Sequence, residues 1–128
     1  MIVVDTSVWI AARRQPSVEK VLHELLEADE ASVPLPVRLE LWAGVAKHDR
    51  KAHRAAFNAV PLLVPTEETW QPLTNWIALA ADAGERFTVT DLLIASLAVE
   101  IGGLVWSLDK DFDRMERLKF VSLYALPH

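Results

Sequence analysis

The stretch from Thr90 to Asp109, TDLLIASLAVEIGGLVWSLD, decides the fold of this chain. Apolar side chains cover every side of residues 91–101, which predicts a buried helix with Thr90 as its N-cap and the pair Gly102-Gly103 at its end. Leu104–Trp106 then has the composition of a short buried strand. A buried helix that leads directly into a buried strand is typical of a parallel sheet covered by helices.

The same alternation of strand and helix extends over the rest of the chain. Apolar runs predict strands, and apolar residues at three- and four-residue spacing predict amphipathic helices. The other expected strands are Ile2–Val4, Ala31–Pro34, Leu62–Val64 and Val121–Leu123. Asp5-Thr6-Ser7 is expected to cap a helix after the first strand, and further helices are expected to begin at Pro16 and at Asp111. Three more helices are expected over Pro36–Lys47, Lys51–Ala59 and Thr66–Gly84. We therefore expect one α/β domain over residues 1–128, with a parallel β-sheet flanked by helices on both faces.

The composition limits the kind of protein. A chain of 128 residues with 52% hydrophobic residues is expected to form one compact domain. Because it has no apolar run of about 18 residues and no signal-peptide pattern, we expect a cytoplasmic protein that makes no contact with a membrane. The absence of cysteine excludes disulfides and thiolate metal sites, so oxygen ligands and hard cations such as Mg²⁺ or Mn²⁺ are favoured. The four histidines lack ligand spacing and are expected at the surface: His23, His48, His53 and His128.

Four acidic residues stand among residues that are otherwise apolar: Asp5, Glu40, Asp91 and Asp109. Asp5 and Asp109 each follow a predicted strand, and the carboxyl ends of parallel strands meet at one edge of the sheet. Taken singly, each Asp is explained as a helix cap or first-turn charge, whereas Glu40 has no such explanation. Taken together they predict a shared cation site, because carboxylates on apolar elements are costly unless a divalent cation compensates them.

Four segments of the chain occur in a recognisable order. They are Ile2-Val3-Val4-Asp5-Thr6-Ser7-Val8-Trp9-Ile10, Arg38-Leu39-Glu40-Leu41-Trp42-Ala43-Gly44, Thr90-Asp91-Leu92-Leu93-Ile94-Ala95-Ser96 and Ser107-Leu108-Asp109-Lys110-Asp111-Phe112. These segments resemble the successive motifs of PIN-domain nucleases, and their size and order are similar to the VapC-type toxins of toxin-antitoxin pairs. The resemblance covers the whole chain. Ser107 stands where the family more often has threonine, and Trp9 stands where an aliphatic residue is more common.

The resemblance implies a metal-dependent endoribonuclease. The four acids named above match the family's acids that bind Mg²⁺ or Mn²⁺ for the hydrolysis of RNA phosphodiester bonds. Asp111 matches an additional acid, and Ser7 matches a small polar residue that supports the site. Two metal ions about 4 Å apart activate water for in-line attack and neutralise charge on the phosphate, so no side-chain nucleophile is required.

The resemblance also implies two protein partners, a cognate antitoxin and a second copy of the chain in a homodimer. For Trp9 and Trp42, core packing and a groove that accepts an apolar helix of the partner are both open, whereas Trp106 is expected in the core. A net charge of −5 does not favour nucleic acid. The clustered Lys and Arg residues at 13–14, 47–54 and 114–119 are explained equally well as solvated surfaces or as phosphate contacts.

Three other functions are compatible with an acidic site on a parallel sheet and are considered in turn. A receiver-type signalling domain needs a phosphorylatable Asp after a middle strand and a Lys after the last one, and neither Ala31–Pro34 nor Val121–Leu123 supplies them. A non-catalytic PIN-like module is expected to have lost some of the acids, and here all four are present. A PIN nuclease that acts in RNA processing without an antitoxin stays open, and an antitoxin gene directly upstream would decide the question.

Overall fold

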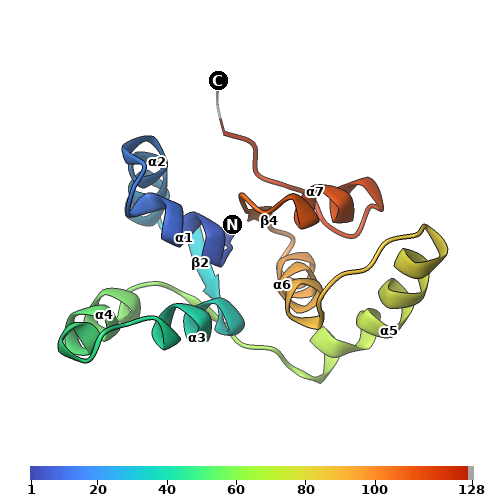
Figure 1. Cartoon of the computed structure of the whole chain (residues 1–128), viewed down its shortest axis with the longest axis horizontal. Helices are drawn as coiled ribbons and strands as arrows, with labels where there is room; N and C mark the ends of the chain where they lie inside the picture. The colour runs from blue at the N-terminus through green and yellow to red at the C-terminus, as the bar shows by residue number, and fades with distance from the viewer. Residues whose placement is uncertain (127–128) are drawn as a thin grey trace.

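The computed structural model describes residues 1–126 (Figure 1). The strands are β1 Ile2–Val4, β2 Ala31–Pro34, β3 Leu62–Leu63 and β4 Leu104–Trp106. The helices are α1 Thr6–Ala12, α2 Pro16–Glu27, α3 Leu35–Ala43, the short 3₁₀ helix η1 Lys47–Asp49, α4 Arg50–Asn58, α5 Glu67–Asp82, α6 Val89–Glu100 and α7 Lys110–Arg117. The strands form one sheet in the order β3-β2-β1-β4, and all neighbours run parallel. The predicted parallel α/β fold is therefore confirmed.

Both faces of the sheet are covered by helices. Val3, Val33 and Val105 point into one core, which they share with buried residues of α3, α5 and α6. Ile2 and Val4 point into a second core, which they share with buried residues of α1 and α2. Successive side chains of a strand point to opposite faces, so this division follows from the apolar runs in the sequence. Trp106 of β4 is 1% exposed, as expected of a core residue.

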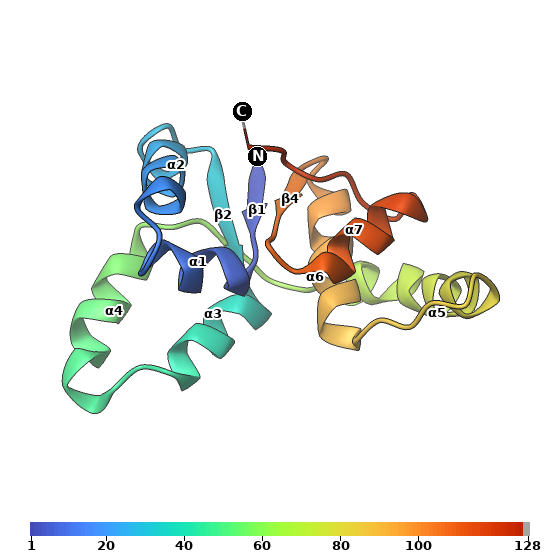
Figure 2. The same cartoon turned by 45° about the horizontal axis from the view of Figure 1, so that its top comes forward.

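The carboxyl ends of β1 and β4 lie side by side. Val4 pairs with Trp106, and the next amide along the chain, that of Asp5, donates to the Trp106 carbonyl at 2.9 Å. Figure 2 shows that the first turns of α1, α3, α6 and α7 gather at this edge of the sheet. Residues at these turns, although far apart in the sequence, are therefore neighbours in space.

The start of α6 differs from the prediction. The Thr88 hydroxyl, not that of Thr90, caps the helix and accepts a hydrogen bond from the Asp91 amide at 3.1 Å. Thr88 lies three residues before Asp91, which is the spacing that lets a cap side chain reach a free amide of the first turn. The middle of the helix is buried as predicted, whereas Val99 in its last turn is 50% exposed.

The helix predicted from Pro36 to Lys47 is shorter than expected. α3 ends at Ala43 because Gly44 caps it, and a separate 3₁₀ turn follows. It is also less enclosed than its apolar sequence suggests, since Leu39 is 56% exposed. One face of α3 is thus an apolar surface rather than core.

The predicted last strand, Val121–Leu123, is reduced to one isolated parallel bridge between Val105 and Leu123. The Val105 amide donates to the Ser122 carbonyl at 3.0 Å, and the Val105 carbonyl accepts from the Tyr124 amide at 2.8 Å. Within residues 1–126 these bonds add the segment to the edge of the sheet without the repeated pairing that defines a strand.

Candidate functional site

Asp5 lies at the end of β1 and is the N-cap of α1. Its carboxylate is buried, and the residue is 6% exposed. One oxygen, Oδ2, accepts from the hydroxyl of Ser7 at 2.8 Å, from the hydroxyl of Ser107 at 2.8 Å, and from the Ser7 amide at 3.4 Å. Three donors on one oxygen hold the carboxylate in place.

The two serine hydroxyls join the ends of β1 and β4. Ser107 accepts from the Asp109 amide at 3.0 Å, and Ser7 accepts from the Leu108 amide at 2.9 Å. Each hydroxyl therefore donates to Asp5 and accepts from the backbone that follows β4. This cross-link fixes the turn that carries Asp109 against the turn that carries Asp5.

Three carboxylates converge beside this cross-link. Asp91, Asp109 and Asp111 each offer an oxygen, and these three atoms lie within 4.8 Å of one another. Asp109 caps α7 and accepts from the Asp111 amide at 2.9 Å, so the two side chains start from one turn. Asp91 comes from the first turn of α6, on the other side of the site. We call these three residues the aspartate cluster.

The charges of the site raise two pKa values. Burial, followed by the charges of Asp5 and then Asp109, raises the pKa of Asp91 to about 6. Partial burial and the charge of Asp5 also raise the pKa of Glu40, although the residue as a whole is exposed on α3. Asp5 thus acts on both residues, and the site holds more negative charge than its own hydrogen bonds compensate.

The four acids named from the sequence are linked through Asp5, but they are not equally close. Asp91 and Asp109 share the aspartate cluster with Asp111, and the charge of Asp5 acts on both Asp91 and Glu40. The chemistry open to such a set of oxygen donors is the binding of a hard divalent cation.

Sequence reasoning gave too little weight to two hydroxyls. Ser107 was noted only as a replacement for threonine, although its position one residue after a strand signals a polar side chain at the sheet edge. Thr88 was missed because Thr90, closer to the apolar run, looked like the better cap. Ser107 donates directly to the carboxylate of Asp5, whereas Thr88 acts on Asp91 through its backbone amide.

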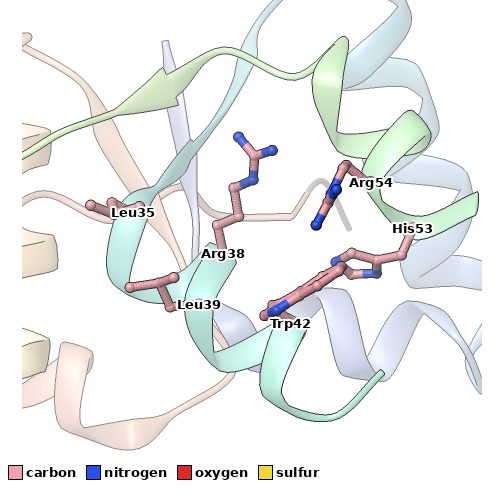
Figure 3. Close-up of a pocket in the computed structure, with 6 residues that line it drawn as sticks. All are labelled: Leu35, Arg38, Leu39, Trp42, His53 and Arg54. Carbon is pink, nitrogen blue, oxygen red and sulfur yellow. The ribbon is translucent and has the colours of Figure 1, made fainter. Parts of the chain in front are cut away.

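A groove between α3 and α4 lies apart from the acids (Figure 3). Its lining consists of Leu35, Arg38, Leu39, Trp42, His53 and Arg54. The Arg54 guanidinium lies 5.0 Å from the centre of the Trp42 ring. Among the described residues, neither arginine of the groove forms an ion pair with a carboxylate. The lining of the groove thus combines apolar side chains with two arginines.

The expectation of surface histidines holds for His23 and His48, whose side chains are 71% and 83% exposed. It is wrong for His53, whose ring stacks on Phe57 with centroids 4.6 Å apart and whose Nε2 is buried without a partner. Burial and the charges of nearby arginines lower the pKa of His53, so it is a neutral part of the wall. His128 lies outside the described residues.

A second hollow lies between α1, α2 and α4. Its lining consists of Trp9, Ala12, Arg13, Glu19, Leu41 and Phe57. The Trp9 ring packs against Phe57 at a centroid distance of 4.8 Å, so this tryptophan is partly core and partly lining. Trp42 stands in the other groove, which places the two tryptophans on different surfaces.

The surface of η1 and α4 is strongly basic. Residues 47–58 contain four Lys or Arg against one Asp, although the whole chain has a net charge of −5. Lys47, Arg50, Lys51 and Arg54 line one depression beside Trp42. Such a patch attracts polyanions despite the acidic balance of the chain.

No helix in residues 1–126 combines the length and the apolar character that crossing a membrane requires.

Solved structures resemble the chain over nearly its whole length. The VapBC2 structure of Rickettsia felis, bound to a DNA fragment from the promoter, has a TM-score of 0.78 at 17% identity and covers 99% of this chain and 100% of that chain. VapBC-1 of nontypeable Haemophilus influenzae has a TM-score of 0.75 at 18% identity and covers 97% of each chain. VapBC-5 of Mycobacterium tuberculosis, from the VapBC family of toxin-antitoxin systems, has a TM-score of 0.68 at 23% identity and again covers 97% of each. At these identities the likeness establishes the fold.

Comparison with curated proteins gives no significant match. The family model described as the PIN domain matches residues 2–118, which includes every element of the sheet and all the acids of the site. This chain therefore belongs to the PIN domain family.

Proposed function

We propose that this protein is a Mg²⁺- or Mn²⁺-dependent endoribonuclease. The observation that carries the proposal is the convergence of Asp91, Asp109 and Asp111 within 4.8 Å, next to the buried carboxylate of Asp5. PIN domains of toxins are nucleases, and a set of carboxylate oxygens suits a hard divalent cation.

The raised pKa of Asp91, about 6, supports a cation at this place. A carboxylate that is half-buried among other carboxylates resists ionisation, and a divalent ion removes this cost when it binds. Bound Mg²⁺ or Mn²⁺ would supply a water activated for attack and positive charge for the phosphate oxygens. In this assignment Asp91 and Asp109 are ligands, Asp5 offers its remaining oxygen to the metal, and Glu40 adds negative charge beside Asp5.

Asp111 and Ser7 have supporting roles in the proposal. Asp111 offers the third oxygen of the aspartate cluster, so it is a ligand or holds a metal-bound water. Ser7 donates to Asp5 at 2.8 Å and orients it toward the site. Asp5 keeps one oxygen, Oδ1, that makes no hydrogen bond with the described residues and remains for the metal.

RNA is the proposed substrate, and the basic surface of α4 supports it. An acidic protein repels a polyanion unless cations are placed locally, and the depression lined by Lys47, Arg50 and Lys51 supplies them.

The enzymatic proposal is tested with a labelled RNA of several hundred nucleotides. Purified protein stripped of metal should leave it intact, and Mg²⁺ or Mn²⁺ added back should give endonucleolytic fragments. Asp109→Asn should give none at any metal concentration, while Asp113→Asn, an exposed acid on the same helix and outside the cluster, should cut at the wild-type rate. Full cleavage in excess chelator would remove the metal from the mechanism.

We also propose that the protein is the toxin of a VapBC-type toxin-antitoxin pair, acting on RNA in the cytoplasm. The similar folds come from structures described as VapBC and as toxin-antitoxin complexes. The hollow lined by Trp9, Leu41 and Phe57 is the proposed seat for an apolar segment of the antitoxin, and Arg13 at its rim suits an acidic residue of that segment.

A homodimer is the proposed assembly, with the exposed face of α3 at its centre. Leu35, Leu39 and Trp42 recur on this face at helical spacing and line the groove of Figure 3. Leu39→Glu should turn a dimer into a monomer in light scattering. Val99→Glu, at a position of similar exposure on α6, should leave the dimer intact, and a wild-type monomer would refute the assembly.

Expression of the protein alone should stop growth, and co-expression of a small open reading frame found directly upstream should restore it. Normal growth with abundant active protein would instead favour the alternative of an RNA-processing nuclease without an antitoxin. That outcome leaves the ribonuclease assignment in place, because it concerns the partner and not the chemistry.

A further inference from the structure

Arg114 of α7 makes three contacts around the aspartate cluster. One guanidinium nitrogen donates to Asp111 Oδ1 at 2.6 Å, and the other donates to the carboxylate of Glu85. The guanidinium carbon lies 4.7 Å from the centre of the Phe87 ring. The Arg114 side chain is 27% exposed, so water screens these contacts only in part.

Glu85 and Phe87 belong to the connection between α5 and α6. This connection leads directly to Thr88, the residue that caps α6 and accepts from the Asp91 amide. Phe87 also packs edge-on against Phe120, with ring centroids 6.2 Å apart. The segment before α6 is therefore held from the α7 side, by Arg114 and by the chain that follows α7.

We propose that Arg114 is a positioning residue that ties the α5–α6 connection to α7 and thereby sets Asp91 at its distance from Asp109 and Asp111. The two ligand-bearing turns come from different parts of the chain, and Arg114 is bonded to both sides: to Asp111 on α7 and to Glu85 before α6. The inference rests on the proposed metal site and adds two residues, Arg114 and Glu85, that do not touch the metal in it.

The chemistry of arginine suits this task better than that of lysine. Its planar fork donates in two directions at once, and its flat face stacks on an aromatic ring, as Arg114 does on Phe87. Lysine at the same position keeps the charge but cannot hold two carboxylates in a fixed geometry. Arg114→Lys therefore separates the geometry of the contact from its charge.

A simpler role for Arg114 would be to neutralise Asp111. Substitution of Glu85 distinguishes this role from that of a positioning residue. The Glu85 carboxylate bonds to Arg114 and is not part of the aspartate cluster. If Arg114 only neutralises Asp111, Glu85→Gln frees Arg114 to pair more closely with Asp111, so metal affinity falls through charge alone and hydrogen exchange of the Asp91 amide stays unchanged. If Arg114 positions the two turns, Glu85→Gln loosens the α6 side, so metal affinity falls and exchange of the Asp91 amide also becomes faster.

The test measures Mn²⁺ binding by electron paramagnetic resonance at a temperature where all variants are folded. Glu85→Gln, Arg114→Lys and Arg114→Gln should each weaken Mn²⁺ binding about tenfold, the usual scale for residues that orient metal ligands. Arg117→Gln is the matched control, because Arg117 is exposed on the same helix and forms no ion pair within residues 1–126. Its Mn²⁺ affinity should equal that of wild type.

A second readout needs no metal. Hydrogen exchange of the Asp91 amide, which is bonded to Thr88, should be faster in Glu85→Gln than in wild type and unchanged in Arg117→Gln. Wild-type exchange of this amide in Glu85→Gln, whether or not Mn²⁺ affinity falls, would overturn the positioning role of Arg114 and leave the metal site standing. Absence of Mn²⁺ binding in wild type would overturn the metal site itself, and the inference with it.

Discussion

Replacing Asp91 by asparagine should stabilise the metal-free protein at pH 8. The pKa of Asp91 is raised from 3.8 to about 6, chiefly by burial and then by the charges of Asp5 and Asp109. At about 1.36 kcal/mol per unit the ionised side chain costs the fold at most about 3 kcal/mol. Because the residue is half-buried, screening by water reduces this to about 1.5 kcal/mol. Loss of the first-turn charge on α6 costs the mutant about 0.5 to 1 kcal/mol, which leaves a net gain of about 0.5 to 1 kcal/mol.

The sign of this effect depends on pH. A raised pKa in the folded state means that stability falls as the pH rises from about 4 to about 6, where Asp91 ionises in the fold. Asp91→Asn does not ionise, so its melting temperature should exceed that of wild type by about 2 to 5 °C at pH 8. Below pH 4 both side chains are neutral, and the two proteins should melt together.

Thermal melts in chelator, and then in Mn²⁺, check both parts of the prediction. At a hundredfold excess over Kd, Mn²⁺ stabilises wild type by about 2.7 kcal/mol, and a tenfold loss of affinity reduces this to about 1.4 kcal/mol. Asp113→Asn, the same change in a first turn outside the cluster, should respond to Mn²⁺ like wild type. A metal-free Asp91→Asn that melts well below wild type and responds equally to Mn²⁺ would show that Asp91 is only a helix-start residue.

Three further predictions concern the serine hydroxyl that joins β1 and β4, the glycine before β4 and the pH dependence of cleavage. Ser107→Ala removes the hydroxyl that bridges the ends of β1 and β4, so Mn²⁺ titrations should show about tenfold weaker binding, and Ser107→Thr should restore it. Gly103→Ala places a Cβ 2.7 Å from the Met1 carbonyl oxygen, so the free energy of unfolding measured in urea should fall by about 1 to 3 kcal/mol. Gly44→Ala, whose Cβ has its nearest neighbour at 3.7 Å, should change this free energy little. Equal effects of the two substitutions would refute the steric argument. At limiting Mn²⁺ the cleavage rate should fall as the pH drops below about 6, where Asp91 takes up a proton. Saturating Mn²⁺ should move this fall in rate to lower pH, because the metal competes with the proton. A fall in rate that stays at the same pH whatever the Mn²⁺ concentration would assign the titration to another group.

The sequence was sufficient for the four paired strands because each lies in a short apolar run, whereas the run at Val121–Leu123 forms only one bridge. Ile2–Val4 and Leu104–Trp106 are buried on both faces, and such runs identify parallel strands without any contact information. The meeting of Asp5 with Asp109 then follows from the rule that parallel strands end at one edge. Periodicity alone therefore placed two of the four acids.

The details of the site depend on contacts between distant residues, which periodicity does not contain. The cap of α6 shifted to Thr88 because three residues of backbone before Asp91 were needed to reach its amide. The partners of Arg114 were invisible for the same reason: Glu85 lies 29 residues away in a connection that has no apolar pattern. The exposure of Leu39 was not foreseen, since no sequence pattern distinguishes an apolar face that meets the core from one that meets another protein.

Binding of Mn²⁺ and cleavage of RNA, measured in the same samples, test the central claim most directly. Wild type is stripped of metal and titrated with Mn²⁺, bound ion is counted by electron paramagnetic resonance, and RNA cleavage is followed in parallel. The two curves should rise together with one half-saturation point, and both should be lost in Asp109→Asn and retained in Asp113→Asn. Full-rate cleavage in samples without bound Mn²⁺ or Mg²⁺, or unchanged Mn²⁺ binding in Asp109→Asn, would contradict the assignment of the acidic site.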